Sequence, residues 1–237
     1  MSTAVKSGFL LINKPCGISS YGCIGHIKRI LKQKIKIGHA GTLDPFAAGL
    51  LVVAIGREAT RCVSQIMAME KTYQATGKCG ELTDTLDLTG TVIQTTTVIP
   101  TQQEIIASIA SFGYCYEQTP PLYSALKYQG DPLYALARKG QMSIEDLQRV
   151  AEAKKRVVQF YTFELISYQA PFFTIKVCVS HGTYIRTLIN DIAVRAGSCA
   201  TTHALSRTAI GHFTLDQAVT LNDLNTIEDI NRLIVQI

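Results

Sequence analysis

The chain has 237 residues, of which 47% are hydrophobic and 17% charged, so it can bury a substantial core and is neither disordered nor fibrous. Its net charge is +5, and its seven cysteines include no Cys-x-x-Cys pair, which favours reduced thiols over a disulfide framework or a zinc site. The longest apolar run, residues 47–55, is half as long as a membrane span requires, and no signal peptide is recognisable, so we expect a cytoplasmic protein.

The first part of the chain predicts short strands around one helix. Residues 9–13 are typical of a strand, and Ser20 is expected to cap a helix that follows. Residues 50–55 form a continuous apolar run that predicts a buried strand. Residues 71–80 alternate between apolar and polar side chains, which predicts a strand with one solvated face, and we expect residues 91–93 to be its hairpin partner.

The second part mixes helices and strands in an irregular order. The pattern predicts helices over 102–112, near 133–137, from Ser143 to Ala153 and over 185–196, with strands at 156–168 and 172–180. Because strands and helices do not alternate regularly, we predict an α+β fold with a mixed, mainly antiparallel sheet flanked by helices. No linker divides the chain, so residues 1–237 are expected to form a single domain.

A basic segment covers residues 28–36. It contains Lys28, Arg29, Lys32, Lys34 and Lys36. Such a run is typical of a solvated helix face, but it also fits a surface that binds a polyanion, with nucleic acid as the first candidate.

Three further segments could carry chemistry. Asp44 lies in a stretch with three glycines and a proline, residues 38–49, which is either an Asp-Pro turn or a loop that presents a carboxylate to a ligand. Arg186 falls in the first turn of its predicted helix, where the helix dipole disfavours a cation, so it requires an anionic partner. Residues 120–127 combine an aromatic ring, Tyr123, with a lysine, a composition that suits RNA.

These motifs together resemble one family. The motifs are Lys14-Pro15-x-Gly17-x-Ser19-Ser20, Gly38 to Gly49, Lys71-x-Tyr73, Thr83-Asp84-Thr85-x-Asp87, Pro120-Pro121-x-Tyr123-Ser124-Ala125-Leu126-Lys127 and Gly182-Thr183-Tyr184-Ile185-Arg186-Thr187. In this order, from about residue 8 to 213, they are similar to the TruB-type tRNA pseudouridine synthases. The resemblance implies the pseudouridine-synthase fold and an isomerase without cofactor or metal.

The resemblance also implies a substrate and a set of site residues. The substrate would be the uridine at position 55 in the T-stem-loop of tRNA, which the enzyme would convert to pseudouridine. The enzyme would act as a monomer and without a membrane. Asp44 matches the nucleophile, Arg186 its ionic partner and Tyr73 the ring that stacks on the flipped base. Substrate-binding positions match His39, Arg61, Asp87, Lys127, Tyr184 and Leu205.

Two aspects of domain organisation follow from the same resemblance. Residues 113–153 are expected to form an RNA-binding insertion. Bacterial relatives usually carry a carboxy-terminal PUA domain, and residues 214–237 are too few and too acidic to supply one, so we expect a short form without it.

Two other functions fit parts of the sequence. An RNA-binding protein of the same fold could fold tRNA with incidental or no catalysis, although the combination of Asp44, Tyr73 and Arg186 argues against it. A glycoside hydrolase would use two carboxylates, with Asp84 or Asp87 as the second, but it gives the basic, tyrosine-rich loop no role.

Overall fold

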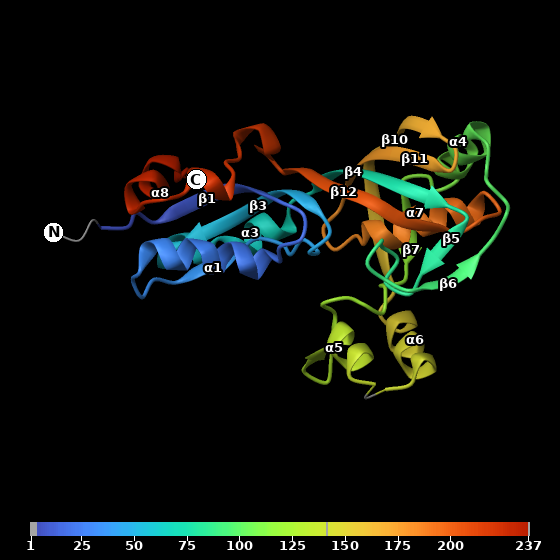
Figure 1. Ribbon diagram of the computed structural model, residues 1–237, viewed down its shortest axis with the longest axis horizontal. Coiled ribbons are helices and arrows are strands. Elements are labelled where there is room, and N and C mark those ends of the chain that lie inside the picture. The colour runs from blue at the N-terminus through green and yellow to red at the C-terminus, as the bar shows by residue number, and fades with distance from the viewer. Residues whose placement is uncertain (1–3, 141, 237) are drawn as a thin grey trace. The chain divides into compact units, whose positions relative to one another are not determined.

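A computed structural model describes residues 4–140 and 142–236 (Figure 1). The chain forms two compact units: the first runs up to Gln74 and resumes at Leu205, and the second spans Ala75–Ala204. Strands β4 (Lys71–Cys79) and β12 (Ala200–Ile210) pass from one unit to the other. No helix within the described ranges is long and apolar enough to cross a membrane.

The first unit is built around a small mixed sheet. Its further strands and helices are β1 (Gly8–Lys14), β2 (Ile37–His39), β3 (Ala48–Ile55), β13 (Phe213–Thr214), α1 (Ser20–Leu31), α2 (Gly56–Arg61), α3 (Val63–Ala68) and α8 (Ile227–Leu233), with short 3-10 helices at Leu215–Gln217 and Leu221–Asp223. Strands β1 and β2 each pair with β3 in antiparallel fashion, whereas β12 runs parallel to β3.

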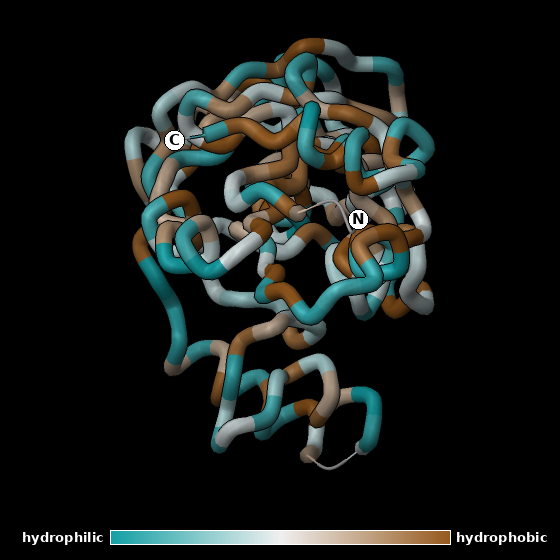
Figure 2. The backbone as a smooth tube through the Cα atoms, turned by 90° about the vertical axis from the view of Figure 1, so that its left-hand side faces the viewer, coloured by the Kyte–Doolittle hydropathy of each residue, from teal (hydrophilic) through white to brown (hydrophobic). Residues whose placement is uncertain are grey.

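Both faces of this sheet are buried, which explains the unbroken apolar run in β3. Side chains alternate along a strand, so Leu51 and Val53 join α1 and α8 in one core cluster, whereas Leu50 and Val52 join α2 and α3 in another. Figure 2 colours the backbone by hydropathy and shows hydrophobic (brown) and hydrophilic (teal) stretches following one another along the chain. Helix α1 accordingly buries one face, with Cys23 and Ile27 fully enclosed.

The second unit is a mainly antiparallel sheet in the order β4-β11-β10-β7. Strand β10 pairs antiparallel with both β11 and β7. The elements of this unit are β5 (Glu81–Thr83), β6 (Val92–Thr95), α4 (Gln102–Ala110), β7 (Cys115–Gln118), β8 (Lys127–Tyr128), β9 (Asp131–Pro132), α5 (Leu133–Arg138), α6 (Ile144–Glu152), β10 (Arg156–Gln169), β11 (Phe172–Val179) and α7 (Ile185–Arg195). The predicted α+β fold with a mixed, mainly antiparallel sheet is confirmed.

The segment between β7 and β10 has a small apolar cluster of its own. Leu133 and Leu136 of α5 meet Leu147 of α6, and less buried side chains such as Leu126 pack against them. Ser143 caps α6 as predicted, since its hydroxyl accepts a hydrogen bond from the backbone N–H of Asp146.

Two local predictions are wrong. Ser19, not Ser20, caps α1, because the Ser20 hydroxyl is used elsewhere, on Leu43. Residues 91–93 do not pair with the strand at 71–80: the chain turns at Gly80, and β6 pairs with β5 instead. The seven cysteines are free thiols in the structure.

Candidate active site

In the first unit, Asp44 lies in the loop that connects β2 to β3. Its side chain is half-buried, and its carbonyl accepts a hydrogen bond from Ala47 N–H at 3.1 Å, which closes a tight turn. Gly49 ends the loop with φ of +104°, and a Cβ there would lie 2.3 Å from the carbonyl oxygen of Arg207. Only glycine therefore permits the close approach of β3 to β12 directly after the Asp44 turn.

The Ser20 side chain fixes the residue before Asp44. Its buried hydroxyl accepts from Leu43 N–H at 2.9 Å and donates to the Leu43 carbonyl at 3.1 Å. Both backbone groups of Leu43 are satisfied by one side chain, so the first residue of α1 holds the loop in a defined position.

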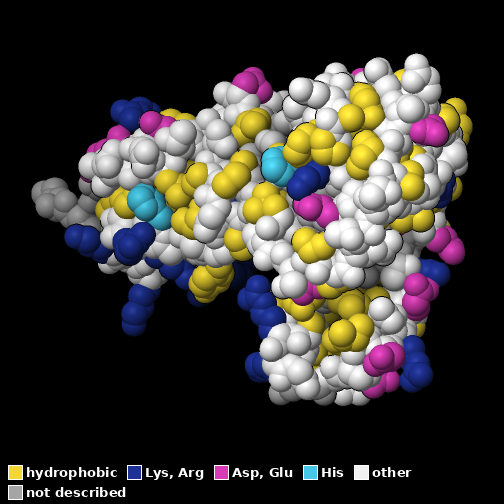
Figure 3. All heavy atoms as spheres, turned by 45° about the vertical axis from the view of Figure 1, so that its right-hand side comes forward, with side chains coloured by type: hydrophobic (Ala, Val, Ile, Leu, Met, Phe, Trp, Pro, Cys, Tyr) yellow, Lys and Arg dark blue, Asp and Glu magenta, His cyan; other side chains and the backbone are white. Residues whose placement is uncertain are grey.

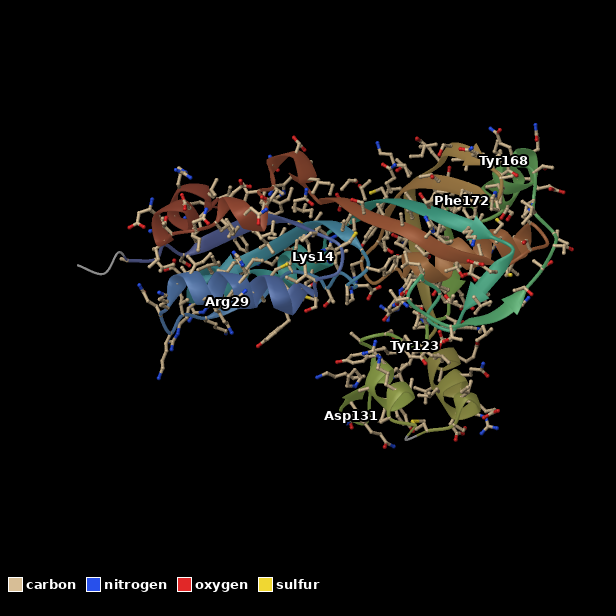
Figure 4. The ribbon with its side chains drawn as sticks, viewed as in Figure 1. Lys14, Arg29, Tyr123, Asp131, Tyr168 and Phe172 are labelled. Carbon is tan, nitrogen blue, oxygen red and sulfur yellow. The ribbon has the colours of Figure 1, made fainter. Side chains whose placement is uncertain are left out.

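A buried lysine holds the other side of the same loop. Lys14, marked in Figure 4, is fully buried and donates to the carbonyls of Ile18 at 2.7 Å, Pro15 at 3.0 Å and Pro45 at 3.4 Å. Burial lowers the pKa of Lys14, and the negative charge of Asp44 opposes that lowering. Lys14 thus provides a positive charge near the carboxylate and contacts the residue that follows it.

Arg207 of β12 is the second buried cation at this loop. It is 1% exposed, and its guanidinium donates to the carbonyls of Leu50 at 2.9 Å, Gly41 at 3.0 Å and Thr42 at 3.5 Å. These acceptors lie on both sides of Asp44 in the chain, so one planar group ties together the beginning and the end of the loop.

Tyr73 and Leu205 are buried in the same unit, at 9% and 8% exposure. Two residues before Tyr73, Lys71 donates to the carbonyls of Met67 at 2.5 Å and Met69 at 2.6 Å. Burial, followed by the charge of Arg207, lowers the pKa of Lys71 to about 8.

His39 and Arg61 differ in exposure. His39 ends β2 and is half-buried; burial and the charge of Arg207 lower its pKa, which favours the neutral ring. Its Nδ1 has no hydrogen-bond partner among the residues that the structure describes. Arg61 is exposed at the end of α2.

In the second unit, Arg186 lies in the first turn of α7 and is 4% exposed. It donates to the carbonyl of Tyr123 at 2.8 Å and to that of Thr85, and it forms an ion pair with Asp87 at 3.6 Å. Asp87 therefore provides an anionic partner of the kind that the sequence predicted for this cation. Its carboxylate is itself held by Thr85 and Thr89, with the Thr89 N–H at 2.9 Å.

Tyr184 precedes α7 and is held by Gln118, a 1% exposed residue at the end of β7. Gln118 accepts from Tyr184 N–H at 2.7 Å and donates to the Tyr184 carbonyl at 3.0 Å. The guanidinium of Arg156 lies over the Tyr184 ring, 5.4 Å from its centroid. Lys127, in contrast, is exposed on β8.

Comparison with known proteins assigns a family to these two sets of residues. A family model described as "TruB family pseudouridylate synthase (N terminal domain)" matches residues 28–185. The chain is 39% identical over 217 residues to the tRNA pseudouridine synthase B of Mannheimia succiniciproducens, covering 92% of this chain and 68% of that one. It is 43% identical over 225 residues to the enzyme of that name from Bordetella avium, covering 94% and 88%. The chain belongs to the TruB family of pseudouridylate synthases.

Solved structures agree with this TruB-family membership. A Cbf5-Nop10-Gar1 complex matches with a TM-score of 0.71 and 27% identity, over 97% of this chain and 60% of that one. An H/ACA RNP bound to a substrate RNA containing 2'-deoxyuridine matches with a TM-score of 0.66 and 26% identity, over 92% and 52%. This chain thus spans slightly more than half of the length of either protein.

The structure divides the predicted site residues of this TruB-family chain between the two units. The first unit holds His39, Asp44, Arg61, Tyr73 and Leu205, and the second holds Asp87, Lys127, Tyr184 and Arg186. Within the described part of the chain, no group of three or more His, Cys, Asp or Glu side chains is arranged to hold a metal ion.

The site residues predicted from the sequence include neither Arg207 nor Gln118. Both are polar side chains at inward positions of strands: Arg207 lies two residues after Leu205, on the same face of β12, and Gln118 ends β7. A cation on the apolar face of a strand is the signal that could have identified Arg207, because such a charge needs partners when it is buried.

Proposed function

We propose that this protein converts uridine to pseudouridine in tRNA, at position 55 in the T-loop, with the carboxylate of Asp44 as the nucleophile. The observation that carries the proposal is the Asp44 loop itself, which two buried cations hold in place. The curated relatives named tRNA pseudouridine synthase B support the reaction and the class of substrate.

The chemistry requires little beyond a well-placed nucleophile. The bond between N1 of uracil and C1′ of ribose breaks, a bond between C5 and C1′ forms, C5 loses a proton and N1 gains one. No electrons are gained or lost, so a group that adds covalently and then leaves can catalyse the change. The base must first leave its stack, because no side chain can reach it there.

The geometry around Asp44 suits that task. Lys14 and Arg207 donate to carbonyls on either side of it, so the loop is held before substrate arrives, and such positioning can provide several kcal/mol of catalysis. Tyr73 offers a ring for stacking on the flipped base, and Leu205 offers an apolar surface.

The remaining predicted residues receive supporting roles in this proposal. Arg186 is the ionic partner of the nucleophile, and Asp87, which pairs with Arg186 at 3.6 Å, positions it. Neutral His39 props the opened loop of the RNA. Tyr184, Arg61 and Lys127 contact the substrate.

We assign RNA binding chiefly to the insertion at 113–153, which contains five tyrosines and four lysines or arginines. The partner is the T-stem-loop of tRNA. Because all the proposed site residues belong to one chain, the protein is proposed to act as a monomer, in the cytoplasm. The alternative of an RNA-folding protein without catalysis is not favoured, since the curated relatives are named as synthases.

The proposal is tested by incubating the protein with an unmodified tRNA transcript and mapping pseudouridine along it. We expect one new pseudouridine, at position 55. A transcript with cytidine at that position is the matched control and should stay unmodified. Modification elsewhere with position 55 untouched would overturn the assignment of the T-loop, and no modification at all would overturn the reaction.

A further inference from the structure

The outer side of α1 and the turn after it form an exposed basic surface, here called the α1 basic surface. It consists of Lys28, Arg29, Lys32, Lys34 and Lys36, all of which are exposed. No Asp or Glu precedes Asp44 in the sequence, so the segment that contains α1 and these five cations has no acidic residue. Figure 3 shows Lys and Arg side chains projecting at the lower left of the view, and Figure 4 marks Arg29 on α1.

The fold does not account for these charges. The buried side of α1 is apolar, and the outer side contributes nothing to the core. Lys28 and Arg29 lie in the last turn, where cations favour the helix dipole, but Lys34 and Lys36 lie beyond the helix. Within residues 4–140 and 142–236, none of the five cations forms an ion pair with a carboxylate.

A glycine on the same stripe of α1 is an independent observation. Residues 21, 25, 28 and 32 follow the spacing that places side chains on one helix face. At Gly25 an added Cβ would meet nothing within 4 Å, so no part of the protein requires glycine there. Glycine inside a helix costs about 0.5–1 kcal/mol relative to alanine, and it leaves the backbone open to close approach by a ligand.

An exposed ring completes the stripe. Tyr21 is 70% exposed, and the Lys28 ammonium lies 5.7 Å from its ring centroid. A ring, a bare stretch of backbone and several lysines in succession suit a nucleic-acid backbone, since lysines act as point charges toward phosphates and rings contact sugars or bases.

We propose that the α1 basic surface binds the sugar-phosphate backbone of the helical stem next to the target nucleotide, with Gly25 at the point of closest approach. This inference rests on the proposed function. The first residue of α1, Ser20, holds the Asp44 loop. At 1.5 Å per residue, Lys28 lies about 12 Å and Lys32 about 18 Å from Ser20 along the helix axis.

That distance identifies the part of the RNA that is contacted. A strand of double-stranded DNA advances about 3.4 Å per nucleotide along its axis, and an RNA stem advances by a distance of the same order. The surface therefore reaches phosphates about four to five nucleotides from a uridine held at Asp44, which is in the stem and not in the loop.

A charge-matched pair of triple variants tests the surface. Lys28→Gln, Lys34→Gln and Lys36→Gln together remove three charges from it. Lys78→Gln, Lys176→Gln and Arg232→Gln remove three that face carboxylates: Lys78 pairs with Glu81, Lys176 is opposite Glu164 in the sheet, and Arg232 pairs with Asp229.

The readout is the Kd for a hairpin with its full stem and for the loop sequence alone, over a range of salt. The surface variant should bind the hairpin at least about tenfold more weakly than the control. The slope of its log binding constant against log salt concentration should be shallower than the control's by about two to three. With the loop alone the two variants should bind alike, and the effect should fall on Kd rather than on the rate at saturating RNA. Equal Kd values on the hairpin, or equal losses on both RNAs, would overturn the inference.

Gly25→Ala provides a second test that unfolding cannot mimic. Alanine should raise the free energy of unfolding by about 0.5–1 kcal/mol while weakening binding of the hairpin. Tighter or unchanged binding would refute the close approach at Gly25. If the wild type binds the hairpin through this surface but forms no pseudouridine, only the proposed function fails. If it forms pseudouridine and the surface variant binds normally, only this inference fails.

Discussion

Replacement of Arg207 by Met tests whether the buried guanidinium holds the Asp44 loop. The change removes the donors to Leu50 at 2.9 Å and Gly41 at 3.0 Å, and a weaker one to Thr42 at 3.5 Å. Each buried carbonyl left without a partner costs about 1–3 kcal/mol. Loss of the two good hydrogen bonds therefore destabilises the fold by about 2–6 kcal/mol. Removing the charge also removes the cost of burying it, and this gain offsets part of the loss.

We expect a net loss of about 2–4 kcal/mol in the free energy of unfolding, which lowers the urea midpoint by about 1–2 M. Single-turnover pseudouridine formation should fall by about 10- to 100-fold, because small displacements of a reacting group have effects of that order. Arg207→Lys keeps the charge but not the planar fork, so its urea midpoint and its single-turnover rate should both lie between those of wild type and Arg207→Met.

Arg232→Met is the control, since Arg232 is exposed and its ion pair with Asp229 at 2.9 Å should contribute less than about 1 kcal/mol. If Arg207→Met has the midpoint of this control and an unchanged single-turnover rate, the reasoning about Arg207 is refuted.

Three further predictions concern other buried polar groups. Burial lowers the pKa of Lys71 to about 8, so between about pH 8 and 10.5 the unfolded state binds more protons than the folded state, and folding stability rises with pH. Over that range the free energy of unfolding of wild type should rise by up to about 3 kcal/mol relative to that of Lys71→Met; a constant difference in urea midpoints would contradict this. Gln118→Met leaves the Tyr184 N–H unpaired and removes one of the two donors to the Tyr184 carbonyl, which keeps the Leu188 N–H at 3.1 Å; the free energy of unfolding should fall by about 1–3 kcal/mol in urea titrations, whereas an unchanged midpoint would show that the Gln118 amide does not stabilise this segment. Arg186→Lys should lose most of its single-turnover rate with little change in tRNA affinity, because lysine lacks the fork that serves several acceptors at once; weaker binding with a normal bound-state rate would make Arg186 a phosphate contact.

Elements with strong local signals could be predicted from the sequence. The apolar run of β3, the alternation in β4 and the stripe of α7 each predict which side chains are buried. Ser143 caps α6 because both partners of its hydroxyl, the N–H and the carboxylate of Asp146, lie in the first turn of the same helix. Ser20 shows the limit. A tertiary contact with Leu43 uses its side chain, and the cap moves to Ser19.

Pairings and polar contacts between distant segments could not be predicted. The partner of β6 depends on a turn at Gly80 that directs the chain into β5. The family motifs led to Asp44, Tyr73 and Arg186, but local pattern contains no information on what Arg207 or Gln118 contacts. Arg207 meets carbonyls more than 150 residues away in the chain, at Leu50 among others.

The central claim is that Asp44 is the nucleophile of a uridine-to-pseudouridine isomerase. It is tested most directly by single-turnover assays of wild type and Asp44→Asn on an unmodified tRNA transcript, with tRNA affinity measured for both. Asparagine has the shape of aspartate but is a far poorer nucleophile. We predict that wild type forms pseudouridine at position 55 and that Asp44→Asn forms none while binding the transcript with unchanged affinity. Substantial turnover by folded Asp44→Asn would contradict the account.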